Sequence, residues 1–156
     1  MINNHTTNKF MKKTRIIFLC TGNAARSQMA EAFLRKFAPE HFEVYSAGFE
    51  AKGVNPYTIK VMEEVGIDMS QHHSKNLDQY LGNVHFGITI TVCDRAEEVC
   101  PTYPSLGTRL YWPFEDPAVF EGTEEEKLEK FRETRDQIKE RVLKWLDERG
   151  IEPKKG

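Results

Sequence analysis

The sequence predicts an α/β fold, with a parallel sheet of four strands covered by helices on both faces. Short apolar runs alternate along the chain with longer segments whose apolar residues recur at helical spacing, as in β-α-β units. The chain has 156 residues, of which 39% are hydrophobic and 29% charged, and this composition suits one globular domain. In such sheets ligands bind at the C-terminal ends of the strands. We therefore expect the polar residues that follow the strands to share one edge.

The first half of the chain is expected to form two strands and two helices. Ile16–Leu19 is an apolar run that predicts a buried strand, and Ser27–Ala38 predicts the helix after it. Glu43–Gly48 predicts a second strand that ends in a glycine turn. Pro56 suits the first position of a second helix, which Gly66 ends. The apolar positions of this helix are Ile59, Met62 and Val65.

The second half is expected to supply two more strands and a long final helix. Within the polar segment Ser70–Asn83, Leu77–Leu81 predicts a short helix. Phe86–Val92 and Arg109–Trp112 predict the third and fourth strands. Thr123–Arg149 predicts the final helix, with a threonine N-cap and glutamates in its first turn. Its apolar face comprises Leu128, Phe131, Ile138, Val142 and either Trp145 or Leu146.

We expect the protein to be cytoplasmic and a monomer. Residues 1–13 are polar and lack an apolar secretory core, so we expect a disordered tail before a single domain at residues 14–150. No apolar run reaches membrane-spanning length. The net charge of −2 gives no reason to expect a nucleic-acid or anionic-membrane surface. Three cysteines without a signal peptide argue against a structural disulfide framework.

The segment between the first strand and its helix has the features of an oxyanion-binding loop around a nucleophile. Cys20 follows the strand, and successive backbone amides before a helix N-terminus can surround a tetrahedral anion. Arg26 adds a planar pair of donors, and the same positive field should keep Cys20 a thiolate at neutral pH. The alternative is a strand-end cysteine that packs as a small hydrophobic residue. The expected binding residues are Thr21, Gly22, Asn23, Ala24, Ala25, Arg26 and Ser27.

Two further cysteines suggest a redox switch. Cys93 ends the third predicted strand, and Cys100 follows after a segment that suits a short helix. Nearly two helical turns would hold the two thiols about 10 Å apart. A disulfide needs Cα atoms within about 7 Å, so that helix must unwind for the two to pair. The alternative is two unrelated core cysteines. Zinc fits poorly, because His72 and His73 are adjacent to each other rather than spaced as ligands.

Asp116 is the candidate general acid. It precedes Pro117 on the loop after the fourth predicted strand, where it can protonate a leaving oxygen. The alternative is a turn aspartate that hydrogen-bonds its own backbone, which is common before proline. Glu115 next to it is the competing carboxylate.

Together these residues resemble the thioredoxin-coupled arsenate reductases of the low-molecular-weight tyrosine-phosphatase superfamily. The resemblance covers Ile16 to about Gly150 and includes the cysteine loop and the pair of downstream cysteines. Its further motifs are Val44-Tyr45-Ser46-Ala47-Gly48, Asn55-Pro56, Glu64-Val65-Gly66-Ile67-Asp68, Thr91-Val92-Cys93, Val99-Cys100-Pro101, Asp116-Pro117-Ala118 and Gly122-Thr123-Glu124-Glu125-Glu126-Lys127.

The resemblance implies a role for each site residue. Cys20 would attack arsenate held by Arg26 and the loop amides, with Asn23 fixing the loop, Ser27 keeping the thiolate ionised and Asp116 protonating the departing water. Cys93 would then release arsenite by forming a disulfide with Cys20. Cys100 would move the disulfide to Cys93–Cys100, which thioredoxin would reduce. Phosphate would compete with arsenate, and no organic cofactor is implied.

Departures from the family pattern bear on the choice of function. Ala24-Ala25 stands where relatives often carry a polar residue and a second cysteine, and Ala118 where phosphatases have tyrosine; both favour the reductase. Asn23, Glu31 and Ser46 match positions that help bind potassium in the reductases, but Lys75 stands where a carboxylate would complete that site. Its ammonium either replaces the ion or is a solvated surface group, and we expect no bound metal.

Two other functions remain open at this stage. One is a low-molecular-weight tyrosine phosphatase that uses Cys20, Arg26 and Asp116, since arsenate and phosphate are nearly the same in shape and charge. The other is an inactive binding module in which the loop only senses an anion. Cys93 and Cys100 discriminate against the phosphatase, which needs neither, and the intact catalytic residues argue against the binding module.

Overall fold

The computed structural model describes residues 12–93 and 107–155. Cys100, the helix predicted between Cys93 and Pro101, and most of the predicted N-terminal tail lie outside the described residues. The described chain forms a four-stranded sheet in the order β2-β1-β3-β4, in which all neighbouring strands are parallel. The strands are β1 (Thr14–Cys20), β2 (Phe42–Gly48), β3 (Ile88–Thr91) and β4 (Thr108–Tyr111). The predicted sheet is therefore confirmed.

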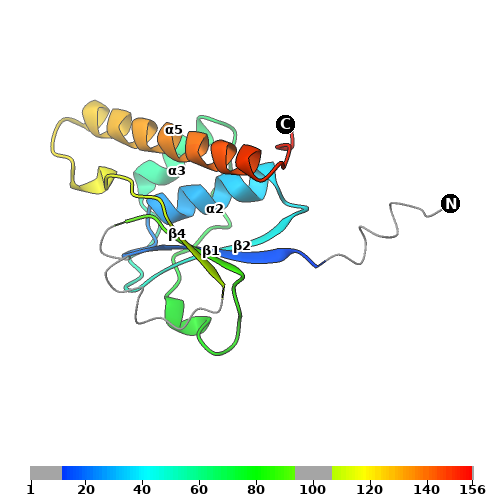
Figure 1. The fold of residues 1–156 in the computed structure, drawn as a ribbon. Coiled ribbons are helices and arrows are strands. Elements are labelled where there is room, and N and C mark those ends of the chain that lie inside the picture. Colours follow the sequence, from blue (N-terminus) through cyan, green and yellow to red (C-terminus); the bar gives the residue numbers. More distant parts are fainter. Residues whose placement is uncertain (1–11, 94–106, 156) are drawn as a thin grey trace.

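Helices cover both faces of this sheet (Figure 1). The long helices α2 (Arg26–Phe37), α3 (Pro56–Glu63) and α5 (Glu124–Glu148) lie on one face, with α2 and α3 each packed against α5. The short 3-10 helix η1 (Leu77–Gln79) lies across the other face. A further 3-10 helix, η3 (Pro117–Val119), precedes α5.

The core lies between β1 and the three long helices. Ile16–Leu19 are completely buried, as the apolar run predicted. The sequence offered Trp145 or Leu146 for the apolar face of α5, and both side chains are buried. Of the apolar positions that the sequence indicated for α3, Met62 is buried but Ile59 is exposed, because the helix directs Val61 and Met62 inward. The predicted N-cap Thr123 is confirmed at the start of α5, where it also forms a capping box with Glu126.

Beyond α5 the chain continues along α2. The backbone amide of Ile151 bonds the Leu146 carbonyl, and that of Lys154 bonds the Phe37 carbonyl at 2.8 Å. None of the described helices is long and apolar enough to cross a membrane. The candidate site lies at the C-terminal ends of the strands, where β1 ends at Cys20 and β3 ends just before Cys93.

Candidate active site

The loop that carries the site turns from the end of β1 into α2. Cys20, the last residue of β1, pairs with Gly48 at the end of β2. Glycine is required there because a Cβ at residue 48 would lie 2.6 Å from the Thr21 carbonyl oxygen and 2.9 Å from the Asn23 nitrogen. The loop backbone therefore packs directly against the end of β2.

The loop turns its amides toward a cleft because its carbonyls are bonded on the other side. Three of these carbonyls accept bonds of 3.0 Å from the backbone of residues 50–55: Thr21 from Glu50, Gly22 from Lys52, and Ala24 from Asn55. In a trans peptide the N–H points opposite to the C=O. The amides of the following residues, Gly22, Asn23 and Ala25, therefore point away from these partners. Together with the start of α2 they form an anion-binding concavity.

Asn23 holds the loop in shape from behind. It has a φ of 50°, a left-handed conformation that non-glycine residues adopt at an energetic cost. Its buried side chain amide donates to the hydroxyls of Ser27 and Ser46 at 2.8 and 2.9 Å. The oxygen of the same side-chain amide accepts from Gln28 Nε2 at 2.9 Å and from the Lys75 backbone amide at 3.0 Å. Four hydrogen bonds thus fix the left-handed residue.

Arg26 enters the cleft as the first residue of α2. Its Nη1 donates to the Phe114 carbonyl at 3.0 Å, and its Nη2 lies 3.5 Å from Asp116 Oδ2. Its Nε is buried and has no acceptor within the described part of the chain. An unpaired buried donor is costly unless a ligand satisfies it. The guanidinium is therefore held at one end and offers a free donor to an anion.

Asp116 has the contacts of a turn aspartate and also lies in the cleft. Its Oδ1 accepts from the Ala118 backbone at 3.0 Å and caps η3, as a turn aspartate does. The same side chain lines the cleft together with Cys20 and contacts Arg26. Glu115 also borders the cleft, but its carboxylate is largely exposed and pairs with Lys130 at 2.9 Å. The geometry favours Asp116 over Glu115 as a proton donor.

Cys20 and Cys93 lie side by side in the cleft, within hydrogen-bonding reach. The bond from Cys20 to Cys93 and burial of the thiol raise the pKa of Cys20, although Arg26 and the Gly22 amide act in the opposite direction. The expectation of a thiolate at neutral pH stays a prediction, because Arg26 and the Gly22 amide favour the thiolate whereas Cys93 and burial oppose it. The sequence expectation considered only the loop, whereas Cys93 follows β3. The Thr21 hydroxyl lies 3.5 Å from the Cys93 sulfur.

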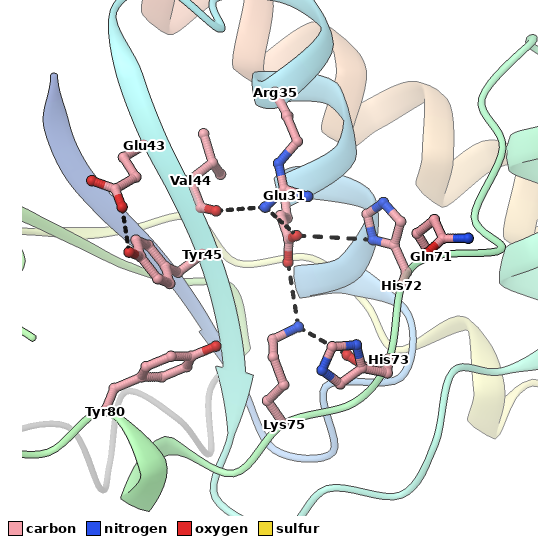
Figure 2. A pocket seen from close by; sticks show the side chains of 10 residues that line it. All are labelled: Glu31, Arg35, Glu43, Val44, Tyr45, Gln71, His72, His73, Lys75 and Tyr80. Carbon is pink, nitrogen blue, oxygen red and sulfur yellow. Dashed lines mark hydrogen bonds and ion pairs between the residues drawn. The ribbon is translucent and has the colours of Figure 1, made fainter.

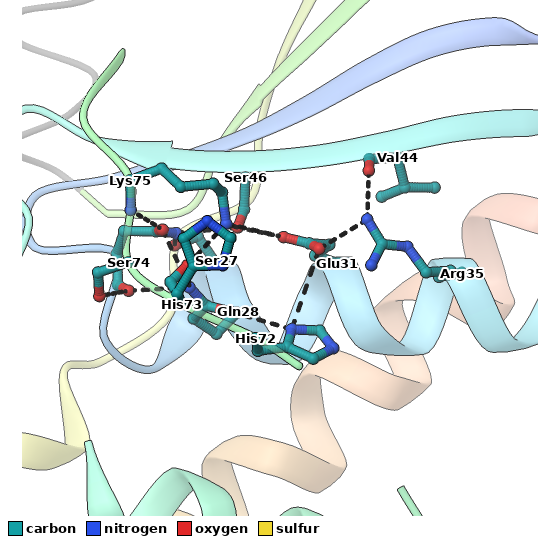
Figure 3. A network of polar contacts seen from close by, with 11 residues as sticks. Ser27, Gln28, Glu31, Arg35, Val44, Ser46, His72, His73, Ser74 and Lys75 are labelled. Atoms are coloured by element: carbon teal, nitrogen blue, oxygen red, sulfur yellow. Dashed lines mark hydrogen bonds and ion pairs between the residues drawn. The ribbon is translucent and has the colours of Figure 1, made fainter. Parts of the chain in front are cut away.

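Behind the loop, Gln28 and His72 belong to a polar network (Figure 3), and Gln28 bonds Asn23 within it. Gln28 Nε2 donates to the backbone carbonyls of Asn23 at 3.1 Å and of His73 at 3.0 Å. It also donates to the side-chain oxygen of Asn23. Its oxygen then accepts from His72 Nδ1 at 3.1 Å, which assigns the hydrogen to that nitrogen. Burial lowers the pKa of His72, although Glu31 nearby opposes this. Burial therefore favours the neutral form of His72.

Lys75 lies inside a pocket of oxygen atoms (Figure 2). Its Nζ is 2.8 Å from the His73 carbonyl, 3.4 Å from the Ser46 hydroxyl and 3.6 Å from Glu31 Oε1. Only 9% of its surface is exposed, so the alternative of a solvated surface lysine is wrong. Burial lowers the pKa of Lys75, whereas Glu31 opposes this shift. Arg35 contacts the other oxygen of Glu31 at 2.7 Å.

The structure separates the predicted site residues into two groups. The cleft is lined by the predicted residues Cys20, Thr21, Gly22, Ala24, Ala25, Arg26, Cys93 and Asp116. The side chains of Asn23 and Ser27 lie behind the loop instead, where Ser27 accepts from Asn23. A bond from Ser27 to the Cys20 sulfur stays a prediction. Sequence reasoning missed Gln28, although its position in the first turn after the loop was a usable signal.

Comparison with known proteins gives the same family as the resemblance in sequence. The profile of the low molecular weight phosphotyrosine protein phosphatase family matches residues 15–154. Relatives include a protein named arsenate reductase from Halalkalibacterium halodurans, 48% identical over 85% of this chain and 94% of its own length. Another, from Bacillus subtilis strain 168 and also named arsenate reductase, is 42% identical over 88% of this chain and 98% of its own.

Solved structures show the same fold. An arsenate reductase in a phosphate-binding state has a TM-score of 0.68 and 31% identity, covering 86% of this chain and 98% of the other. A low molecular weight protein tyrosine phosphatase from T. tengcongensis has a TM-score of 0.70 at 23% identity, covering 87% and 99%, and this likeness concerns the fold alone.

Proposed function

Because the chain belongs to the low molecular weight phosphotyrosine protein phosphatase family, we propose that it is an arsenate reductase with Cys20 as its nucleophile. The full-length relatives that are named arsenate reductase support this assignment. The single observation that carries it is the contact between Cys20 and Cys93 at the anion-binding loop. Hydrolysis of a phosphate ester does not use the Cys93 thiol, whereas a reductase needs that thiol to accept the first disulfide bond.

The first step forms a bond between sulfur and arsenic. The loop amides and the free Nε of Arg26 bind the oxygens of arsenate, and the Cys20 thiolate attacks the arsenic atom. Asp116 donates a proton to the departing oxygen, which leaves as water. Arsenic remains As(V) at this stage, bound to the Cys20 sulfur.

The second step transfers two electrons to arsenic. Cys93 attacks the Cys20 sulfur, a sulfur–sulfur bond forms, and the pair of electrons of the sulfur–arsenic bond stays on arsenic. Arsenite, As(III), then leaves, while Cys20 and Cys93 have together lost two electrons. The contact of the two thiols before substrate binds means that this attack needs little movement of Cys93.

The third step regenerates the nucleophile. Cys100 attacks the Cys93 sulfur, which releases Cys20 as a thiolate and leaves a Cys93–Cys100 disulfide. A dithiol of the thioredoxin class then reduces that disulfide and becomes oxidised itself.

The proposal is tested by arsenate-dependent oxidation of NADPH in the presence of thioredoxin and thioredoxin reductase. Cys20→Ser, Cys93→Ser and Cys100→Ser should each abolish turnover. Single-turnover release of arsenite should survive in Cys100→Ser alone, because that variant retains the two thiols of the second step. Arsenate turnover by Cys93→Ser would show that the relay is wrong.

A phosphatase remains the second candidate, and the contact of Arg26 with Asp116 in the cleft favours it. Hydrolysis of a phosphate ester needs the loop, Cys20, Arg26 and a carboxylic acid, all of which are present. Assay of an aryl phosphate with the same cysteine variants separates the two functions. If efficient ester hydrolysis accompanies a lack of arsenate turnover, the chain is a phosphatase.

A further inference from the structure

Lys52 lies at the mouth of the cleft that holds Cys20 and Arg26. It belongs to the connection between β2 and α3, and its backbone amide bonds the Gly22 carbonyl at 3.0 Å. Its side chain lies along the loop, because a Cβ built on Gly22 would stand 3.5 Å from its Cγ and Cδ atoms. Both its backbone and its aliphatic stem are thus fixed to the anion-binding loop.

Among the described residues, the charge of Lys52 differs from the other charges of the cleft in having no ion-pair partner. Arg26 pairs with Asp116, and Glu115 pairs with Lys130. Lys52 forms no ion pair within residues 12–93 and 107–155. It is also the only lysine among the described residues that line the cleft. Because the whole chain carries a net charge of −2, attraction of an anion has to arise locally.

We propose that Lys52 is a substrate-binding residue whose ammonium meets the incoming oxyanion at the mouth of the cleft. The inference rests on the proposed function only in taking a tetrahedral oxyanion as the ligand. Arg26, already paired with Asp116, supplies a compensated charge, and Lys52 adds the second positive charge that favours a dianion over a monoanion. Its fixed stem limits the region that the ammonium can reach, which keeps this charge near the loop.

The position of Lys52 predicts which kinetic constant it controls. An exposed ammonium at the mouth contacts the anion equally well before and during the reaction, and such uniform binding lowers KM without raising kcat. The attraction is also screened by salt, since the group is open to solvent. Lys52 is therefore expected to act on affinity at low ionic strength.

The test compares Lys52→Gln with the matched control Lys60→Gln. Lys60 is an exposed lysine of α3 that does not line the cleft, and both substitutions remove one positive charge. The measurement is the affinity for inorganic phosphate, followed through protection of Cys20 from alkylation in low and high salt. Lys52→Gln should weaken binding roughly three- to fivefold at low salt, the range of an exposed ion pair. Lys60→Gln and Lys52→Arg should bind as the unmodified protein does, and high salt should remove the difference.

Phosphate affinity keeps this proposal separate from the proposed function. If the unmodified protein fails to reduce arsenate but Lys52→Gln still weakens phosphate binding, the reductase assignment fails and the role of Lys52 stands. Equal phosphate affinity of Lys52→Gln and Lys60→Gln would overturn the role of Lys52, whatever the arsenate assay shows. A defect of Lys52→Gln confined to the KM for thioredoxin would also overturn it and assign the residue to partner docking.

Discussion

The two sides of the loop between β1 and α2 are built in opposite ways. On the cleft side, Arg26 Nε has no acceptor among the described residues, and the amides of Gly22 and Ala25 point away from their bonded neighbours. On the other side, the Asn23 side chain makes four hydrogen bonds, and Gln28 links it to His72. The difference teaches that donors can be kept free for a ligand when the opposite side fixes the backbone that carries them.

The physical basis is the cost of the loop conformation. The left-handed φ of Asn23 costs about 1–2 kcal/mol, and the row of aligned amides adds unpaired donors. Each hydrogen bond behind the loop contributes about 1 kcal/mol, so the four bonds of Asn23 offset that cost. Substitutions on the two sides should consequently have different signatures.

The largest effect is expected on the cleft side, from Arg26→Lys. The lysine ammonium cannot reproduce a planar pair of donors, so kcat/KM should fall on the order of a thousandfold. The free energy of unfolding should fall by only about 1 kcal/mol, because the substitution loses the bond to the Phe114 carbonyl and the contact with Asp116 but also removes a buried donor that has no partner among the described residues. Steady-state kinetics and thermal melts of one preparation measure both. A large loss of stability would show that Arg26 supports the fold, as the opposite side does.

The second effect is expected behind the loop, from Asn23→Asp. Aspartate keeps the shape of the side chain but loses the two donations to Ser27 and Ser46, and it adds a buried negative charge near Glu31. The free energy of unfolding should fall by about 3 kcal/mol, and affinity for phosphate should fall with it. Denaturant unfolding monitors the first quantity. If activity were lost at unchanged stability, Asn23 would belong to the cleft side.

A smaller effect on the pH dependence of Cys20, together with opposite changes in two activities, is expected from Cys93→Ala. Removing the bond to Cys93 takes away the largest cause that raises the pKa of Cys20. The thiolate fraction at neutral pH then increases about tenfold for each unit of pKa. Alkylation of Cys20 and hydrolysis of an aryl phosphate should therefore shift to lower pH, while arsenate turnover disappears. An unchanged pH profile of alkylation would mean that Cys93 does not control the Cys20 proton.

The smallest effect is expected from exchanging potassium for sodium. The Lys75 ammonium already fills the oxygen pocket made by Glu31, Ser46 and the His73 carbonyl, so the unmodified enzyme should respond little. Lys75→Asp should create a potassium dependence, because the carboxylate restores an oxygen-rich cation site. Kinetics in matched chloride salts decide the point. Strong activation of the unmodified enzyme by potassium would show that Lys75 does not replace the ion.

Features of the site that depend on residues close together in the chain could be predicted from the sequence. Cys20, Gly22 and Arg26 could be assigned because a buried strand, a glycine loop and a helix follow one another within one short stretch. Asp116 followed from its place after β4, since the strand ends of a parallel sheet share an edge. Each of these assignments needs only local periodicity and the topology of the sheet.

What the sequence could not predict depends on contacts between distant segments. The pKa of Cys20 is raised by Cys93, which lies two strands further along the chain. The bonds of Gln28 to the His73 carbonyl and to His72 form only because residues 72–75 pack behind the loop. The stem of Lys52 lies on Gly22 because the connection after β2 folds back. No periodicity in the sequence reports such packing.

The central claim is that the cleft side of the loop binds a tetrahedral oxyanion while the opposite side stays fixed. Titration of the isotope-labelled reduced protein with inorganic phosphate, followed by NMR, tests it most directly. The Arg26 Nε–H and the amides of Gly22, Asn23 and Ala25 should shift together and saturate at one affinity. The side-chain amide signals of Asn23 and Gln28 should stay in place. An Arg26 Nε–H that does not respond, or side-chain amides that move as far as the loop, would contradict the account.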